Sequence, residues 1–136
     1  MALIVQKYGG TSVGSVARIQ AVAAQVHALA KSGHQVAVVV SAMGDSTDRL
    51  IELAREVCPD PDPREMDALL ATGEMVSTAL LAMALRKDGC GARSYNALQL
   101  PIETTGLPGR ARIERVGCDG LRQDLAAGVV PVVAGF

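Results

Sequence analysis

The residues that could carry chemistry begin with a lysine and two glycines near the start of the chain. Lys7, Gly9 and Gly10 follow the short apolar run Leu3 to Val5 and precede a long helical pattern. A strand, a glycine turn and a helix together form an anion site, because the first N–H groups of a helix are unpaired and its dipole is positive there. Glycine lets backbone amides approach phosphate oxygens closely, and lysine adds a mobile positive charge. We therefore expect this segment to bind a phosphate.

The spacing of the glycines does not match either of the common nucleotide motifs. No G-x-x-x-x-G-K-[ST] sequence occurs anywhere in the chain, which excludes a P-loop. Gly9, Gly10 and Gly14 also fail to match the dinucleotide pattern G-x-G-x-x-G. The residue types alone therefore predict a phosphate ligand and nothing more specific.

Other polar residues allow both a functional and a structural interpretation. Glu74 interrupts an otherwise apolar helical pattern, and a solvated helix glutamate would explain it equally well. Ser46 and Thr47 follow a second glycine turn, where helix capping needs no ligand. His27 and His34 have no cysteine or carboxylate cluster near them in sequence, and we expect both at the surface.

The composition indicates one domain with an aliphatic core. The chain has 136 residues, and its aromatic residues are only Tyr8, Tyr95 and Phe136. A chain of this length forms one domain by prior expectation. The net charge is -1 with both signs interspersed, a pattern that predicts no binding to nucleic acid or to an anionic membrane. We expect a small-molecule partner instead.

Targeting and redox signals favour a cytoplasmic protein. The longest apolar runs, Ala79 to Leu85 and Val129 to Ala134, are shorter than the roughly 18 residues of a membrane span. The first predicted strand starts two residues into the chain, so we expect no targeting peptide before it. Cys58, Cys90 and Cys118 are odd in number and far apart, which predicts reduced thiols and no metal site.

Strands and helices alternate along the chain, a pattern that predicts a layered α/β domain with a mainly parallel sheet. A proline-rich linker, Pro59 to Pro63, separates two of the helices. Gly73 falls inside the longest helix and predicts either a kink or a close approach to another element. The expected helices run from Gly14 or Ser15 to Ser32, Asp48 to Cys58, Arg64 to Lys87 and Cys118 to Ala126, and the expected strands are Leu3 to Val5, Gln35 to Ser41, Ala92 to Ala97, Ile102 to Thr104, Ala111 to Val116 and Val129 to Ala134.

The candidate site residues follow the carboxyl ends of the predicted strands, where ligands bind in open α/β sheets. Lys7 to Ser12 follows the first strand, Ser41 to Thr47 the second, and Gly135 the last. We expect these three glycine-bearing turns to converge on one edge of the sheet.

Three blocks together resemble one family. They are Lys7 to Gly14 (KYGGTSVG), Val38 to Leu50 (VVVSAMGDSTDRL) and Asp67 to Glu74 (DALLATGE), and with Pro131 to Phe136 the likeness spans the chain. Their order and spacing resemble aspartate kinase, in the amino-acid kinase superfamily. The resemblance implies a three-layer α/β/α sandwich around a mainly parallel sheet.

The resemblance also implies phosphoryl transfer from MgATP to the side-chain carboxylate of L-aspartate, the first step of lysine, threonine and methionine biosynthesis. The cofactors implied are ATP and Mg²⁺, with no metal ligand among these residues. By motif, Lys7 would neutralise charge on the transferring phosphoryl group, and the nucleotide phosphates would be bound by Lys7, Gly9, Gly10, Thr11 and Ser12. Ser41 and Thr47 would line the aspartate pocket, and Glu74 would pair with the substrate ammonium group.

The family continues beyond these motifs, with a nucleotide lobe and usually regulatory ACT domains. We therefore expect residues 1–136 to be the N-terminal, amino-acid substrate lobe of a truncated catalytic domain, inactive alone, from a homo-oligomeric enzyme. Two alternatives stay open: a non-catalytic module that binds phosphate or nucleotide, and a structural fragment that associates with its own copies.

Overall fold

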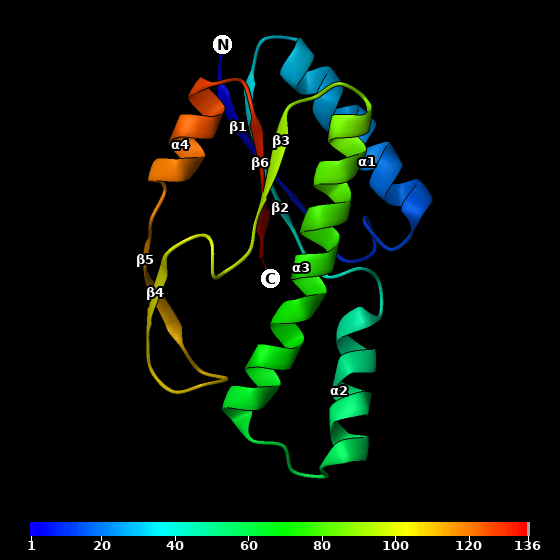
Figure 1. Ribbon diagram of the computed structural model, residues 1–136, viewed down its shortest axis with the longest axis vertical. Coiled ribbons are helices and arrows are strands. Elements are labelled where there is room, and N and C mark those ends of the chain that lie inside the picture. The colour runs from blue at the N-terminus through cyan, green and yellow to red at the C-terminus, as the bar shows by residue number, and fades with distance from the viewer. Residues whose placement is uncertain (136) are drawn as a thin grey trace.

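The computed structural model describes residues 1–135, and Phe136, which ends the last predicted motif, lies outside the described residues (Figure 1). Four strands form a parallel sheet in the order β1-β2-β6-β3. The elements in chain order are β1 (Leu3–Tyr8), α1 (Val16–Lys31), β2 (Gln35–Val40), α2 (Ser46–Val57), α3 (Pro63–Lys87), β3 (Ala92–Tyr95), β4 (Ile102–Thr105), β5 (Arg112–Val116), α4 (Asp119–Ala126) and β6 (Val130–Ala134).

The sheet lies between two layers of helices, as the expected three-layer architecture requires (Figure 1). Helices α1 and α3 pack on one face, where Val36, Val38 and Val40 of β2 form the core. The shorter α4 covers the other face near β2 and β6. Strand β2 lies inside the sheet between β1 and β6, and helices α1, α3 and α4 cover its faces, which explains its unbroken run of valines.

Strands β4 and β5 stand apart from the sheet as an antiparallel hairpin. The register shifts between Glu103 and Thr104, and every residue of β5 is exposed. The prediction of two short strands here is confirmed in position. Their pairing with each other alone was not foreseen.

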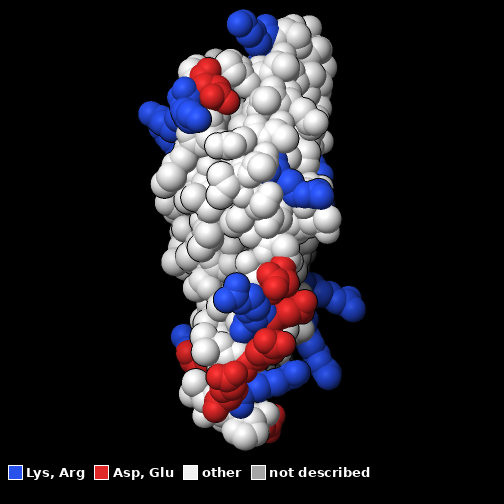
Figure 2. All heavy atoms as spheres, turned by 90° about the vertical axis from the view of Figure 1, so that its right-hand side faces the viewer, with Lys and Arg blue, Asp and Glu red and all other residues white. Residues whose placement is uncertain are grey.

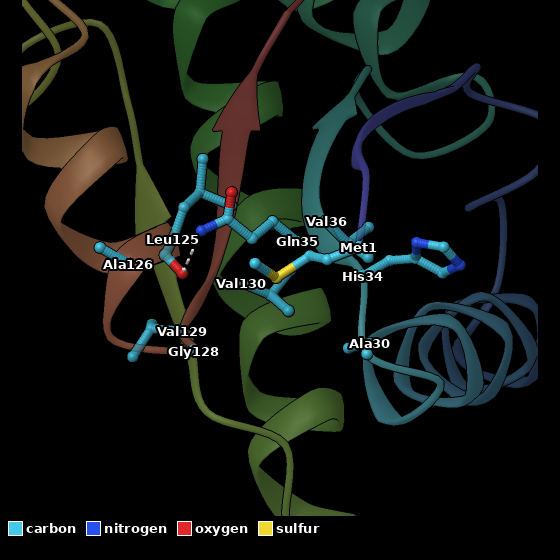
Figure 3. A pocket seen from close by; sticks show the side chains of 11 residues that line it. Met1, Ala30, His34, Gln35, Val36, Leu125, Ala126, Gly128, Val129 and Val130 are labelled. Atoms are coloured by element: carbon cyan, nitrogen blue, oxygen red, sulfur yellow. Dashed lines mark hydrogen bonds between the residues drawn. The ribbon is translucent and has the colours of Figure 1, made fainter.

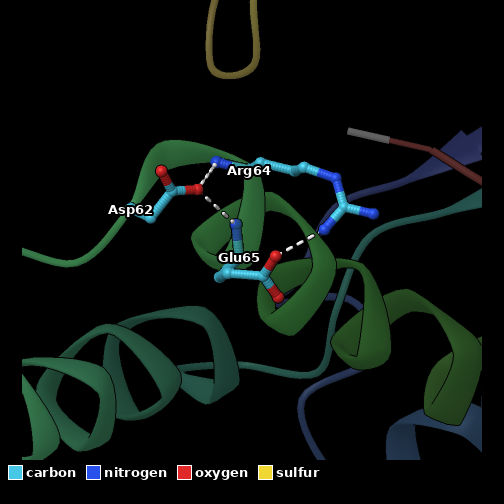
Figure 4. Close-up of polar contacts among 3 residues, drawn as sticks. All are labelled: Asp62, Arg64 and Glu65. Carbon is cyan, nitrogen blue, oxygen red and sulfur yellow. Dashed lines mark hydrogen bonds and ion pairs between the residues drawn. The ribbon is translucent and has the colours of Figure 1, made fainter.

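Helix α3 begins one residue earlier than predicted, at Pro63. Asp62 caps it, because Oδ1 accepts hydrogen bonds from the N–H groups of Arg64 (2.9 Å) and Glu65 (3.2 Å) (Figure 4). Proline suits the first helical position, since its missing N–H would be unpaired there anyway. The Arg64–Glu65 ion pair beside this cap is exposed and contributes little to stability.

Gly73 marks a close approach of α3 to the turn after β2, and α3 continues through it without interruption. A Cβ added at Gly73 would lie 2.8 Å from the Cβ of Ala42. Of the two predicted explanations for this glycine, the close approach is therefore the one observed.

Helix α3 is also the one helix within residues 1–135 that is long and apolar enough to cross a membrane, judged by length and composition alone. The expectation from apolar runs missed it, because polar residues are interspersed among its apolar ones. The helix packs against α1, α2, β3 and β6, and Glu74 is among its buried residues. Packing inside the domain accounts for its apolar character.

Charged residues of both signs crowd the α2 end of the molecule, whereas the rest of the same face is largely uncharged (Figure 2). None of the residues of α2 is buried. The helix carries Asp48, Arg49, Glu52, Arg55 and Glu56, all exposed. Acidic and basic side chains therefore alternate along this helix.

Candidate functional site

Three turns meet at the carboxyl edge of the sheet, as their positions in the sequence predicted. The N–H of Gly44 donates to the carbonyl of Gly10 at 2.9 Å, and that of Ser41 donates to Tyr8 at 3.1 Å. The N–H of Gly135 donates to the carbonyl of Val40 at 3.0 Å. These bonds tie the ends of β1, β2 and β6 into one edge.

The two glycines of the first turn, Gly9 and Gly10, have different surroundings. A Cβ at Gly10 would lie 2.8 Å from the carbonyl oxygen of Ala42, so only glycine lets this turn contact the next one. A Cβ at Gly9 would meet nothing within 4 Å. The space beside Gly9 is therefore open.

Helix α1 begins at Val16 rather than directly after the glycines. Ser15 caps it, with Oγ accepting from the N–H of Arg18 at 3.2 Å. The Arg18 guanidinium donates to the carbonyl oxygen of Thr11 at 3.2 Å, which holds the turn against the helix. Thr11 and Ser12 are exposed on this turn.

Lys7 and Glu74 lie on opposite sides of the sheet at its carboxyl edge. Lys7 is exposed, and its neighbour Tyr8 packs toward the core under α1 and α3. Since side chains alternate along a strand, Lys7 projects from the other face. Glu74 belongs to α3, which packs on the face of the sheet toward which Tyr8 points.

Glu74 is the most unusual residue of the site, because it is a buried carboxylate. It is 4% exposed, and its Oε2 has no hydrogen-bond partner among the described residues. Burial raises the pKa of the Glu74 carboxyl, and hydrogen bonding from the backbone N–H groups of Glu74 and Ala42 opposes part of that rise. The interpretation as a solvated glutamate is wrong, because α3 turns this side chain toward the sheet edge.

A cavity of about 220 Å³ adjoins Glu74. Its lining is otherwise apolar and comes from four parts of the chain, namely α3, the segment between β3 and β4, the β4–β5 hairpin and the end of β6: Ala71, Met75, Ala97, Ile102, Ile113, Ala134 and Gly135. A cavity with one carboxylate in an apolar wall suits a small ligand that carries one positive charge.

Ser41 and Thr47 differ in how firmly they are held. Ser41 is half-buried, and its backbone is fixed by Tyr8 and by the hydroxyl of Ser77, which donates to the Ser41 carbonyl oxygen at 2.7 Å. Thr47 lies in the first turn of α2, where Asp45 is the N-cap residue and makes no capping bond. Capping by Ser46 or Thr47 is therefore not observed among the described residues.

Sequence reasoning missed several contributors to this region. Ser77 is polar yet 1% exposed, and its position one turn after Glu74 was a signal that could have been used. Ile102 and Ile113 reach the cavity only because the hairpin folds back over α3. Asp67 accepts a hydrogen bond from the N–H of Gly109 at 2.6 Å, which fixes the hairpin tip to α3. No local pattern indicates such a distant contact.

A second cavity, of about 280 Å³, lies at the opposite, amino edge of the sheet (Figure 3). The amide of Gln35 donates to the carbonyl oxygen of Leu125 at 3.1 Å, so its main polar side chain is already paired. Met1, Val36 and Val130 contribute apolar walls. This cavity therefore lacks the convergent polar groups of a ligand site.

The histidines and cysteines form no metal site within residues 1–135, where no group of at least three potential ligands gathers. His27 and His34 are half-buried, and Nδ1 of His34 accepts from the N–H of Ala2 at 3.2 Å. The three cysteines are free, as expected. Burial raises the pKa of the Cys90 thiol, which makes it less reactive.

These features define a class of protein, an α/β domain with a cavity and three turns at the carboxyl edge of a parallel sheet. The sequence profile described as the amino acid kinase family matches residues 2–136. The chain belongs to the amino acid kinase family.

Relatives within that family carry the name aspartokinase. The chain is 52% identical over 136 residues to an aspartokinase of Mycobacterium bovis, and 52% identical to aspartokinase 2 of Bacillus subtilis. These matches cover 100% of the chain, which spans about a third of the length of each relative (32% and 33%).

Solved structures agree with this likeness. The crystal structure of aspartate kinase from Synechocystis superposes with a TM-score of 0.84 at 49% identity, over 98% of this chain and 22% of that one. E. coli aspartokinase III, solved with aspartate and ADP, superposes with a TM-score of 0.81 at 22% identity, over 100% of this chain and 41% of that one. The second match supports the fold alone, and together they confirm the expected parallel α/β architecture.

Proposed function

We propose that the chain forms the amino-acid substrate lobe of an aspartate kinase, which transfers a phosphoryl group from ATP to the side-chain carboxylate of L-aspartate. The observation that carries this proposal is Glu74, a buried carboxylate with an unpartnered oxygen beside a small cavity. A buried carboxylate is costly unless a cation pairs with it. The ammonium group of an amino acid supplies that cation.

The remaining roles follow from position at the same edge. The hydroxyls of Ser41 and Thr47 would hydrogen-bond to the substrate carboxylates. Lys7 and the backbone amides beside Gly9 would face the transferring phosphoryl group, where the space is open. Such a transfer needs no covalent nucleophile, because positioning and electrostatic stabilisation carry most of the catalysis.

ATP supplies the phosphoryl group in this proposal, and the open backbone at Gly9 fits an anion of that kind. The residues described, 1–135, do not fit Mg²⁺ equally well, because no cluster of three or more potential ligands occurs among them. We therefore derive no step that depends on a protein-bound Mg²⁺ here.

Calorimetric titration of the chain with L-aspartate, ATP and inorganic phosphate tests the assignment. Glu74→Gln should abolish aspartate binding and leave anion binding intact, because it removes only the charge that pairs with the ammonium group. Glu65→Gln, which removes an exposed glutamate of the same helix, should change neither. Gly9→Ala should weaken anion binding at unchanged stability, since its Cβ enters open space.

Other outcomes favour the alternatives. Anion binding without aspartate binding would indicate a phosphate or nucleotide module, and no binding with concentration-dependent association would indicate a structural role. Equal loss of aspartate and anion binding in Glu74→Gln would contradict the separate roles.

We also propose that residues 1–136 alone show no aspartate-dependent turnover. A lysine about 4 Å from a phosphate contributes roughly 4 kcal/mol at an effective dielectric constant near 20, whereas enzymes lower barriers by about 8–23 kcal/mol. One lysine charge and two amide dipoles are too few to supply that stabilisation. A coupled ADP assay showing turnover near that of a full-length aspartokinase would refute this proposal.

A further inference from the structure

A single peptide group, between Ser41 and Ala42, is in contact with α3 at both of its polar ends. Its carbonyl oxygen accepts a hydrogen bond from Ser77 Oγ at 2.7 Å. Its N–H, which belongs to Ala42, lowers the pKa of the Glu74 carboxyl and so favours the charged form. Since a trans peptide group is planar, fixing the carbonyl direction also fixes the N–H direction.

Ser77 is unusual among buried helix hydroxyls, because it bonds outside its own helix. Its Oγ lies 3.2 Å from the carbonyl oxygen of Glu74, one turn back, and nearer, at 2.7 Å, to that of Ser41. A hydroxyl has one proton to donate, and the shorter contact takes it. Ser41 directly follows the end of β2, and the Ser77 hydroxyl is the α3 donor to its carbonyl oxygen.

Thr78 provides a direct comparison at the next position. Ser77 and Thr78 are both 1% exposed. Thr78 Oγ1 bonds only within α3, to the carbonyl oxygens of Glu74 at 2.9 Å and Met75 at 3.1 Å. This is the usual local bonding of a buried helix hydroxyl. The bond from Ser77 to another element is therefore not a general consequence of burial.

The approach of α3 to the turn leaves little freedom for this geometry. Gly73 contacts Ala42 so closely that a Cβ would be 2.8 Å from the Ala42 Cβ. Gly73 and Ser77 thus contact two successive residues of the turn, Gly73 by packing on Ala42 and Ser77 by its hydrogen bond to Ser41.

We propose that Ser77 is a positioning residue, whose hydroxyl orients the Ser41–Ala42 peptide group so that the Ala42 N–H faces Glu74 and the Ser41 side chain faces the substrate. This inference rests on the proposed function for its meaning, since Ser41 and Glu74 are the residues assigned to aspartate. The bond itself is a property of the free chain.

The test is a ¹³C NMR titration of the Glu74 side-chain carboxyl in the 136-residue chain. Ser77→Ala should raise the Glu74 pKa by about half a unit or more and shift the Ala42 amide resonance, because the N–H is no longer held toward the carboxylate. Thr78→Val, which deletes the neighbouring buried hydroxyl, should leave both signals within error. A purely structural role of Ser77 would not separate the two variants in this way.

Ser77→Cys is a second variant, for the case in which Ser77→Ala does not fold, since a thiol is similar in shape to the hydroxyl. Because a thiol is a weaker hydrogen-bond donor, Ser77→Cys should raise the Glu74 pKa by an intermediate amount. An unchanged Glu74 pKa in Ser77→Ala or Ser77→Cys, or an equal shift in Thr78→Val, would overturn the proposal. Where the wild-type chain binds aspartate, Ser77→Ala should lower that affinity about tenfold. If the wild type binds no aspartate, the proposed function fails, and the titration still decides the role of Ser77.

Discussion

Replacing Gly73 by alanine should destabilise the protein, although alanine is the better helix former. The substitution adds a Cβ that would lie 2.8 Å from the Cβ of Ala42, which is itself 4% exposed. Carbon atoms in good contact are about 3.5–4.0 Å apart, so roughly 1 Å of movement is required. Neither Cβ can rotate away, because each is fixed by its backbone.

The surroundings of Ala42 make that movement costly. Gly10 contacts the Ala42 carbonyl from the other side, and the Ser77 hydroxyl holds the preceding carbonyl of Ser41. Overpacking of this kind costs about 1–3 kcal/mol, and the gain in helix propensity is at most about 1 kcal/mol. With two rigid partners we take the upper part of the cost, which leaves a net loss of about 1–2 kcal/mol and a fall in Tm of about 3–8 °C.

Thermal and urea denaturation followed by circular dichroism would measure this change. The matched control is Gly120→Ala in α4, whose Cβ would meet the Tyr95 hydroxyl oxygen at an ordinary 3.5 Å. That variant should be neutral or slightly more stable than the wild type. If Gly73→Ala melts at or above the wild-type temperature, the close approach of α3 to the turn is not what requires glycine at this position.

Burial raises the pKa of Glu74 above its ordinary value, so ionisation of this carboxyl lowers the free energy of unfolding. In urea denaturation, Glu74→Gln should therefore be as stable as the wild type near pH 4 and more stable than the wild type near pH 7. Equal stability of the two proteins at both pH values would contradict this. Tyr95→Phe should cost about 1–3 kcal/mol in urea denaturation, because it deletes the buried donor that bonds to Asp124 Oδ2 at 2.6 Å, and an unchanged midpoint would count against that bond. Asp67→Ala should speed limited proteolysis of the β4–β5 hairpin at unchanged Tm, since it removes the exposed acceptor for the Gly109 N–H, and cleavage at the wild-type rate would show that this contact does not hold the hairpin.

The helices and strands could be predicted from the sequence because the patterns that indicate them are local. The apolar run of β2 and the helical periodicity of α1 depend on residues near each other in the chain, and both elements form close to where they were expected. The convergence of three turns also followed from topology, since the carboxyl ends of parallel strands share one edge.

The geometry of the site was less accessible, because it depends on contacts between distant segments. The spacing of Glu74 left a solvated side chain and a functional one equally open, since its burial depends on where α3 packs. The hydroxyl of Ser77 bonds to a residue 36 positions earlier, and the N–H of Gly109 to one 42 positions earlier. Patterns of spacing within one helix or strand carry no information about such pairs.

The glycine turn and the buried glutamate are mechanically linked through Ala42. The carbonyl of Ala42 leaves room only for glycine at position 10, its Cβ only for glycine at position 73, and its N–H favours the charged form of Glu74. A change in the first turn should therefore reach the carboxylate without touching it. Gly10→Ala, which would place a Cβ 2.8 Å from the Ala42 carbonyl oxygen, should move the Glu74 carboxyl resonance, whereas Gly9→Ala should not, because no atom lies within 4 Å of its added Cβ. Equal shifts in both variants would argue against Ala42 as the connection.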